Sequence, residues 1–505
     1  MPDLIQLYQT VCQYARRTAV LASIQELLGW DERTQMPAAG AEHRAEQSTL
    51  LAGLIHQRWV DPKFGDQLEE LSQGLQNESD RFSDAAVILR RLKRQREKRL
   101  KLPQFLVEEL ARTAVLAQQA WQAARQNDDY PSFQPLLERT IELKRQQAEA
   151  LGYPRCPYDA LLDEFEPEEI TDNIQPVLAQ LREELLPLVA QIQDSRRRPN
   201  TALLRRRFPV AEQERFARAA ATAIGFDFNR GRLDVTAHPF CCSLGPHDCR
   251  ITTRYNENHF SAAFFGVLHE AGHGIYEQNL PTEHYGTPLG EAISLGIHES
   301  QSRLWENLVG RSRAFWMHFF PLAQQHFPEA LSDVALDDFH FAVNDVRPSL
   351  IRVEADEVTY NLHILVRFEL ERALLEDQLG AGDLPAVWNE KYRHYLGIVP
   401  SNDREGVLQD VHWSAGLFGY FPTYSLGNLY AAQFFAQAEA ELGNLAEHFA
   451  AGEFRPLLDW LKEKIHRHGQ RFTAAELVRQ VTGRPLSARP LVDHLRAKMG
   501  SLYEL

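Results

Sequence analysis

The first 195 residues are an almost unbroken succession of helix-forming segments, and this pattern constrains the fold more than any other feature of the chain. Four long stretches are rich in Ala, Leu, Glu, Gln and Arg, which favour helices, and short turns with Pro, Asn or Asp separate them. These stretches are residues 41–58, 66–98, 104–127 and 132–151. Few segments show the alternation that is typical of strands. We therefore predict a mainly α fold.

One region departs from this helical pattern. Residues 232–255 contain the clearest strand signals, and in residues 249–255 polar positions alternate with less polar ones, which predicts a half-buried strand in one small β-sheet. The sequence SRRRPN at 195–200 is the best candidate boundary. We expect an N-terminal helical lobe (1–195) and a second helical lobe with the small sheet (196–505), together forming one compact unit.

The charge of the chain restricts its partners. A formal charge of −15 over 505 residues repels phosphate backbones and anionic lipid heads, so we expect no nucleic-acid partner. The basic run at 90–101 interleaves Leu92 and Leu100 at helical spacing and is interpreted as a solvated helix. No stretch approaches the roughly 18 apolar residues of a membrane span, so no membrane partner is expected either.

The cysteines and the N-terminus predict a cytoplasmic location. The chain has 5 cysteines, an odd and small number for its length, which is not a disulfide framework. The first 20 residues form an amphipathic helix pattern without the basic start and continuous apolar core of a signal peptide.

The segment at 260–280 carries the strongest chemical signal. It has the apolar stripe of a helix and contains His269, Glu270 and His273. Histidines four positions apart lie one turn apart on the same helix face, where both imidazoles can bind one zinc ion. Glu270 is then placed to act on water as a general base without binding the metal. The competing interpretation, two hydrogen-bonded core histidines, is weakened by the three glycines beside them at 266, 272 and 274.

A catalytic zinc ion needs a third protein ligand and an open position. The following segment, 290–310, offers Glu291 and Glu299, and the spacing from His273 does not choose between them. His298 and Gln301 flank Glu299 and are candidates for supporting hydrogen bonds to a ligand.

Six sequence motifs occur along the chain in a fixed order: H-P-F at 238–240, D-x-R-x-T at 248–252, H-E-A-G-H at 269–273, H-E-S-Q at 298–301, I-R-x-x-A-D at 351–356 and G-x-x-Q-D-x-H-W at 406–413. The segment at 30–37, WDERTQMP, belongs with them. In these motifs the chain resembles the M32 metallocarboxypeptidases, the thermostable carboxypeptidase Taq family. The resemblance covers nearly the whole chain.

The resemblance implies more than the spacing does. It makes Glu299 the third metal ligand and Glu291 a residue at a helix start. It implies a large helical metallopeptidase fold with a deep active-site groove and a gluzincin-type zinc helix, and it implies a homodimer. It further implies a carboxypeptidase of broad specificity, poor at proline, that releases single C-terminal residues from peptides and uses zinc, for which cobalt can substitute.

A carboxypeptidase must bind a free α-carboxylate, and an arginine does so with two charge-assisted hydrogen bonds. The candidates within the motifs are Arg250, on the predicted strand, and Arg352, in a predicted long helix. The alternatives are structural ion pairs of Arg250 with Asp248 and of Arg352 with Asp356. An extended substrate could add to the Arg250 strand as a further strand.

The predicted mechanism needs a hydrogen-bond donor for the oxyanion as well. His412 is favoured because a family motif contains it, and Tyr420 is the second candidate. His238 is expected to support the strand or the substrate site. In this mechanism a zinc-activated water attacks the scissile carbonyl, and Glu270 takes its proton and passes it to the leaving amine.

Three other interpretations compete with this one. A zinc oligopeptidase that cuts internal bonds would use the same centre. A non-catalytic peptide-binding protein on the same fold would be expected to have lost Glu270 or a ligand. A second metal site among the Cys and His residues at 238–249 is disfavoured, because these residues lack a C-x-x-C pair and a strand directs neighbours to opposite faces.

Overall fold

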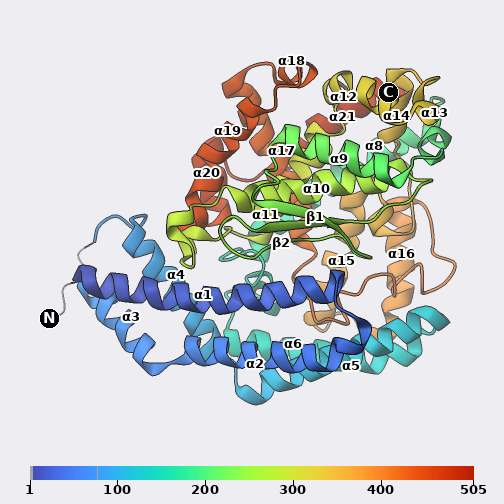
Figure 1. Cartoon of the computed structure of the whole chain (residues 1–505). Helices are drawn as coiled ribbons and strands as arrows, with labels where there is room; N and C mark the ends of the chain where they lie inside the picture. The colour runs from blue at the N-terminus through green and yellow to red at the C-terminus, as the bar shows by residue number, and fades with distance from the viewer. Residues whose placement is uncertain (1–3, 77) are drawn as a thin grey trace. The chain divides into compact units, whose positions relative to one another are not determined.

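The computed structural model describes residues 4–76 and 78–505 and is mainly helical, as predicted (Figure 1). Its contacts divide the chain into two compact units, each assembled from separate segments. Unit 1 comprises residues 1–100, 200–343 and 434–484, and unit 2 comprises residues 101–199, 344–433 and 485–505. The chain passes from unit 2 to unit 1 at 199–200, which falls on the predicted boundary, but residues 1–195 are divided between both units. The division into lobes 1–195 and 196–505 therefore stays a prediction.

Unit 1 contains the small sheet and most of the short helices. Its elements are α1 (Leu4–Thr34), α2 (Ala41–Val60), α3 (Pro62–Gly74), α4 (Asp84–Lys101, ending one residue into unit 2), α9 (Val210–Ile224), β1 (Gly231–Val235), β2 (Cys241–Ser243), β3 (Cys249–Thr253), α10 (Phe260–Gln278), α11 (Leu295–Arg303), α12 (Arg313–His326), α13 (Pro328–Leu331), α14 (Leu336–Val343), α18 (Leu445–Ala450), α19 (Arg455–Lys464) and α20 (Ala474–Thr482). Helix α11 continues directly into a π-helix, η5 (Leu304–Val309).

Unit 2 is entirely helical in its regular elements. They are α5 (Gln104–Asn127), α6 (Tyr130–Leu151), α7 (Pro157–Leu162), α8 (Thr171–Asp194), α15 (Thr359–Leu375), α16 (Leu384–Leu396) and α21 (Arg489–Tyr503). Helix α17 (Pro422–Leu442) begins in unit 2 and ends in unit 1. Helix α15 is the centre of this unit, because nearly all of its side chains are buried.

The three strands form the predicted sheet, in the order β1-β3-β2. Strand β3 lies in the middle, parallel to β1 and antiparallel to β2, with Leu233 and Cys241 both opposite Ile251. A central strand has no free edge, so a substrate cannot add to β3 as the sequence suggested. Strand β3 also differs from the predicted half-buried strand. Thr252 and Thr253 are adjacent and both fully buried.

The sheet supports α10, which runs along it in Figure 1. The buried side of α10 is aromatic: Phe260 and Phe264 are stacked at 5.3 Å, and Phe264 stacks on Phe216 of α9 at 5.0 Å. Gly272 allows close packing, since a Cβ there would lie 2.6 Å from the backbone of Ser302. Sheet, α9 and α11 thus hold α10 in one position and orientation.

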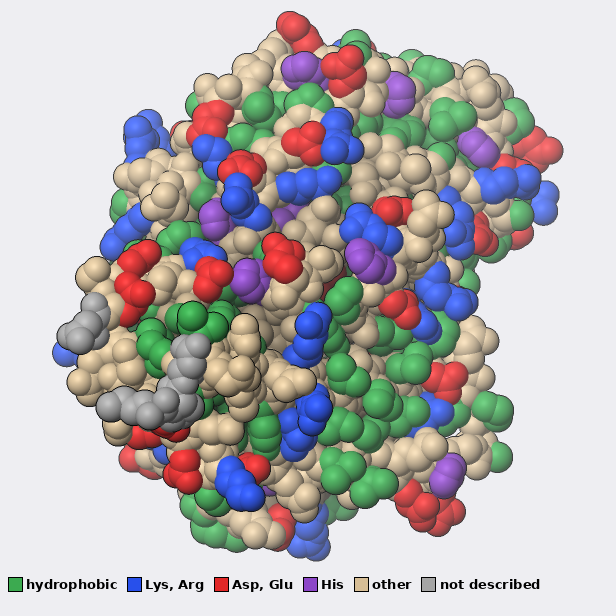
Figure 2. Space-filling model, turned by 60° about the vertical axis from the view of Figure 1, so that its left-hand side comes forward, with side chains coloured by type: hydrophobic (Ala, Val, Ile, Leu, Met, Phe, Trp, Pro, Cys, Tyr) green, Lys and Arg blue, Asp and Glu red, His purple; other side chains and the backbone are tan. Residues whose placement is uncertain are grey.

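The surface of the molecule is mixed in charge. Acidic and basic side chains are interspersed over the face drawn in Figure 2, although the chain carries a net −15. No helix in the described part of the chain is long and apolar enough to cross a membrane.

Candidate functional site

Helix α10 begins at Phe260, and His259 caps it by accepting a hydrogen bond from the amide of Ala262 at 3.2 Å. The cap fixes the first turn, and the predicted motif residues follow two to three turns later.

The structure brings the three predicted ligands together. One ligand atom from each of His269, His273 and Glu299 lies within 4.8 Å of the other two, and this is the only such cluster of three among the described residues. The Oε2 atom of Glu299 is 3.6 Å from Nε2 of His269 and 3.3 Å from Nε2 of His273. Helices α10 and α11 therefore present two imidazole nitrogens and a carboxylate to one point.

The other nitrogen of each histidine ring is bound by a neighbouring group. Nδ1 of His269 donates to Oε2 of Glu306 at 2.9 Å. Nδ1 of His273 lies 2.5 Å from Nδ1 of His298, whose Nε2 donates to Glu277 at 2.9 Å. In a neutral His298 ring, Nδ1 is then the acceptor for the proton of His273. Both Nε2 atoms that face Glu299 are thus left available for a metal.

Glu299 is buried and Glu306 is 12% exposed, and both carboxylates remain charged. Burial alone would raise their pKa values, but Arg303 and His269 outweigh it. The pKa of Glu299 falls well below its usual range, and that of Glu306 falls to about 2. Arg303 donates to Glu299 at 2.7 Å and to Glu306 at 3.3 Å, and Arg311 donates to Glu306 at 3.4 Å.

The pKa values of the two histidines shift in opposite directions. Burial lowers the pKa of His273 to about 4. Burial also lowers the pKa of His269, but the charges of Glu299 and Glu306 outweigh this and raise it to about 8. The charges of Glu299 and Glu306 therefore favour a positive charge on the His269 side of the cluster.

Glu270 lies beside the cluster on α10 and is 7% exposed. Burial, followed by the charges of Glu299 and Glu306, raises the pKa of its carboxyl to about 7, against the partial opposition of His269. A carboxyl with a pKa near neutrality can both accept and release a proton at physiological pH.

Glu291, the other ligand candidate, does not join the cluster. It follows the 3₁₀ turn Pro288–Gly290 and accepts a hydrogen bond from Gln470 at 3.2 Å. The prediction that Glu291 lies at a helix start is wrong, because α11 begins at Leu295 with Ser294 as its cap.

The two predicted substrate-binding residues of unit 1 lie on the sheet and on a loop beside it. Nε and Nη2 of Arg250 each donate to a carboxylate oxygen of Asp248 at 2.9 Å, and its guanidinium lies 4.3 Å from the Trp30 ring centre. This is the ion pair considered from the sequence. His238 is exposed, between β1 and β2.

Arg352, in unit 2, is buried in a network of charges. The predicted long helix around it is wrong: Arg352 is in a 3₁₀ turn (Arg352–Glu354), and α15 begins only at Thr359. Arg352 does not pair with Asp356. Its Nε and Nη2 donate to Oδ1 of Asp410 at 3.0 and 2.9 Å, and the fully buried Arg367 donates to Oδ2 at 2.6 Å. Burial opposes a charged Asp410, but the two arginines lower the pKa of its carboxyl far below the usual range.

His412 and Tyr420 are neighbours in unit 2. Their ring centres are 5.3 Å apart, and Nε2 of His412 lies 3.3 Å from the hydroxyl of Tyr424. Burial lowers the pKa of His412 to about 4, so its ring is neutral at physiological pH. Its Nδ1 is buried and has no hydrogen-bond partner among the described residues.

The Cys and His residues at 238–249, the disfavoured second metal site, do not form a group of three ligands in the described part of the chain. All five cysteines are free thiols. Cys241 and Cys249 have sulfur atoms 3.7 Å apart, whereas His238 and His247 of the same stretch are exposed.

Sequence reasoning missed Glu306, which accepts a hydrogen bond from His269, and Glu277, which accepts one from His298. Glu306 did carry a signal, since it is a charged residue within a mostly apolar segment, LWENLV. Glu277 is four residues after His273 and so lies on the same face of α10.

The carboxypeptidase Taq (M32) metallopeptidase family matches residues 10–499. Thermostable carboxypeptidase 1 of Thermus thermophilus is 52% identical over 98% of this chain and 99% of its own length. Carboxypeptidase 1 of Bacillus subtilis is 40% identical over 100% and 98%. The crystal structure of an M32 carboxypeptidase from Deinococcus radiodurans, 40% identical, superposes with a TM-score of 0.96 over 99% of this chain and 100% of the other.

Proposed function

Because the chain belongs to the carboxypeptidase Taq (M32) family of metallopeptidases, we propose that it is a zinc carboxypeptidase that releases single residues from free peptide C-termini. The observation that carries the zinc assignment is the convergence of His269, His273 and Glu299 within 4.8 Å. Two imidazoles and one carboxylate form a donor set typical of catalytic zinc, with a fourth position left for water or substrate.

The surrounding hydrogen bonds support this assignment. Glu306 and His298 hold the Nδ1 sides of the two histidines, so the Nε2 sides face Glu299. Such outer partners fix the ring orientation and the tautomer that a metal requires. When bound, zinc supplies Lewis acidity that makes water nucleophilic at neutral pH.

Glu270 is proposed as the general base. It directly follows His269 on α10, and the pKa of its buried carboxyl is raised to about 7. It accepts a proton from the attacking water and then donates that proton to the leaving amine. A carrier whose pKa lies near the working pH populates both protonation states, so it can take up the proton and release it again.

Binding of the C-terminal carboxylate of the peptide substrate is assigned to the two arginines within the motifs. Asp248 and Asp410 hold the guanidinium groups of Arg250 and Arg352 in fixed orientations. A preoriented guanidinium loses less conformational entropy when it binds a carboxylate. The exposed His238 is proposed as a further substrate contact.

The hydrogen bond that stabilises the oxyanion is assigned to His412, with Tyr420 as a second donor. A neutral imidazole keeps one N–H to donate, and the low pKa of His412 keeps it neutral. Its buried Nδ1 makes no hydrogen bond within the described chain and lies 3.9 Å from Oδ1 of Asp410, while Nε2 lies 3.3 Å from the hydroxyl of Tyr424.

Family membership supports the remaining assignments: broad specificity with poor cleavage at proline, cobalt as a substitute for zinc, a deep active-site groove and a homodimer. The cysteine content supports a cytoplasmic location, and the net charge of −15 supports the absence of nucleic acid among the partners.

The test uses two peptides that are blocked at the N-terminus and differ only in having a free or an amidated C-terminus. We expect the zinc-loaded protein to shorten only the free acid, residue by residue by mass spectrometry, and chelator or Glu270→Gln to abolish this. Equal internal cleavage of both peptides would instead identify an oligopeptidase. No cleavage of either, with zinc verified as bound, would favour a peptide-binding protein.

A further inference from the structure

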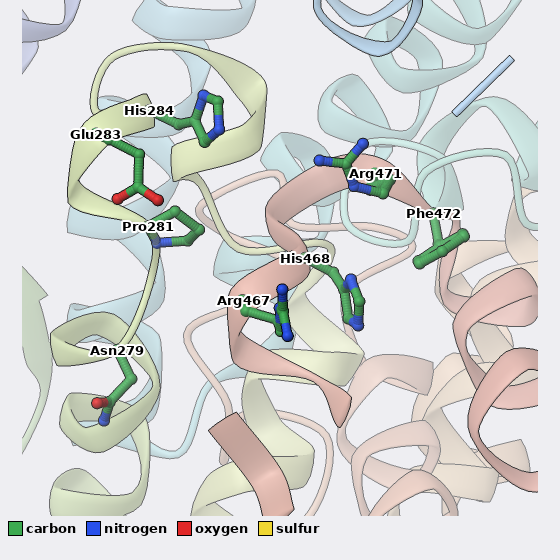
Figure 3. A pocket seen from close by; sticks show the side chains of 8 residues that line it. All are labelled: Asn279, Pro281, Glu283, His284, Arg467, His468, Arg471 and Phe472. Atoms are coloured by element: carbon green, nitrogen blue, oxygen red, sulfur yellow. The ribbon is translucent and has the colours of Figure 1, made fainter. Parts of the chain in front are cut away.

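A cavity of about 530 Å³ lies in unit 1, at the end of α10, and the proposed chemistry does not use it. Side chains from two segments line it. The first segment contributes Asn279, Pro281, Glu283 and His284, and the second contributes Arg467, His468, Arg471 and Phe472. Figure 3 shows these side chains, with the guanidinium of Arg471 directed toward the His284 side. The volume lies within the range of roughly 300–1,000 Å³ that small-molecule sites occupy.

The lining is basic, although the chain as a whole is acidic. Two arginines and two histidines face the cavity, against one carboxylate, Glu283. His468 is subject to this field: burial and then the charges of Arg467 and Arg471 lower the pKa of its ring. The two guanidinium groups are thus the positive charges of the lining, and two carboxylates outside it, Glu463 and Asp84, pair with them.

One arginine is held rigidly. Arg471 donates to the backbone carbonyl of Phe82 and, at 2.7 Å, to Oδ1 of Asp84. The other oxygen of Asp84 lies 3.6 Å from Nε2 of His284. These contacts place the Arg471 guanidinium before any ligand arrives, and they use only part of its five N–H donors.

The other arginine is easily available to a ligand. Arg467 pairs with Glu463 one turn earlier, at 2.6 Å, and both side chains are mostly exposed (59% and 63%). An exposed pair of this kind contributes little to stability, so a stronger anion can displace Glu463.

The remaining wall is aromatic. The ring centre of Phe472 lies 5.3 Å from that of His468. It lies 5.0 Å from that of Phe82, and the planes of these two phenyl rings are tilted by 53°. A flat apolar surface beside two guanidinium groups fits a ligand with a planar ring and a doubly charged anionic group. Guanidinium groups bind phosphate bidentately, and two of them match a dianion better than a single carboxylate.

We propose that this cavity binds a small phosphorylated organic molecule, with Arg467 and Arg471 on the phosphate and the Phe472 side on the ring. It is distinct from the metal cluster, whose residues do not line it. The proposal does not depend on the peptidase assignment, and its test does not measure peptidase activity.

The test is calorimetric titration of the metal-loaded protein with adenosine monophosphate, and with adenosine for comparison, in low-salt buffer without phosphate. We expect the nucleotide to bind at least about tenfold more tightly than the nucleoside. Arg467→Gln should weaken nucleotide binding about tenfold or more, and His468→Asn should weaken it by a smaller factor.

The matched control is Arg455→Gln. Arg455 forms the same kind of exposed pair, with Asp459 one turn later at 2.7 Å, but does not line the cavity. Its replacement should leave nucleotide affinity unchanged. Equal affinity in the Arg467 and Arg455 variants would overturn the proposal, since the nucleotide would then bind at the metal or non-specifically. Absence of binding to the unmodified protein at millimolar nucleotide would overturn it as well.

Discussion

Oε2 of Glu306 lies 2.9 Å from Nδ1 of His269, although the two residues belong to different helical elements and are 37 positions apart in the chain. The same carboxylate receives Arg303 and Arg311. Glu306 therefore links the metal-site histidine to two fixed positive charges and holds the imidazole in the tautomer that exposes Nε2.

Replacement of Glu306 by Gln should weaken zinc binding about 10- to 100-fold, because the neutral amide no longer raises the basicity of His269. Zinc affinity is measured by competition with a chromophoric chelator, and circular dichroism reports whether the helices persist. Glu463→Gln, an exposed change in the same unit, is the control. Unchanged zinc affinity in a folded Glu306→Gln protein would show that Glu306 is not a positioning residue.

Glu299 and Glu291 provide a matched pair for the third ligand. Glu299→Gln should abolish stoichiometric zinc binding, because it removes the carboxylate that lies 3.3 Å from Nε2 of His273. Glu291→Gln should retain zinc, because Glu291 lies outside the cluster and contacts Gln470. Metal content after dialysis, measured by atomic emission, distinguishes them. Zinc retained by Glu299→Gln and lost by Glu291→Gln would reverse the assignment.

The convergence of His269 and His273 could be predicted from the sequence because its geometry is local. Positions 269 and 273 must share a face of any α-helix, so His269 and His273 converge wherever that helix lies. The choice of Glu299 over Glu291 needed the family resemblance. It depends on where α11 begins, and the turn before Ser294 takes Glu291 away from the cluster.

The supporting contacts could not be predicted in the same way. A π-helix (Leu304–Val309) follows α11 and contains Glu306, and no local pattern indicates this change of helix type. Arg352 was expected to face a partner one turn away, whereas Asp410 is 58 residues distant. Pairings of this kind arise from tertiary packing, which residue periodicity does not encode. The position of β3 at the centre of the sheet has the same origin.

His466 should make the protein sensitive to acid. It is fully buried, its Nε2 donates to Gln301 at 2.9 Å, and burial lowers the pKa of its ring to about 3. Between about pH 6.5 and 3 the unfolded chain binds a proton here that the folded chain does not. Stability is therefore lost as pH falls through this window, by up to about 1.4 kcal/mol per pH unit.

In the variant His466→Gln, the amide can still donate to Gln301 but does not titrate. Urea unfolding is measured at a series of pH values. Below about pH 6.5, the urea concentration at the unfolding midpoint should fall less steeply with pH than in the unmodified protein. His394→Gln removes an exposed imidazole as control and should leave the slope nearly unchanged. Parallel pH dependences for all three proteins would mean that His466 does not cause the acid sensitivity.

The two candidate arginines can be separated by the ratio of kcat/KM for a free-acid peptide to that for its C-terminal amide. A residue that binds the carboxylate contributes only to the first substrate, so its replacement should reduce this ratio. Truncating one side of a buried charged hydrogen bond costs about 2–5 kcal/mol, which corresponds to a reduction on the order of 30-fold or more. Arg250→Lys and Arg352→Lys keep the charge but remove the planar fork, which limits damage to the ion pairs with Asp248 and Asp410.

A purely structural arginine behaves differently under this test. If Arg352 only neutralises Asp410, Arg352→Lys should lower the unfolding temperature and reduce both kcat/KM values alike, leaving their ratio intact. The same holds for Arg250 and Asp248. Arg367→Lys is the control for the buried network, since Arg367 also donates to Asp410, at 2.6 Å, but is completely buried and cannot reach a substrate. A ratio that falls in Arg352→Lys and not in Arg367→Lys would assign the carboxylate to Arg352. A ratio unchanged in both Arg250→Lys and Arg352→Lys would exclude both arginines from carboxylate binding.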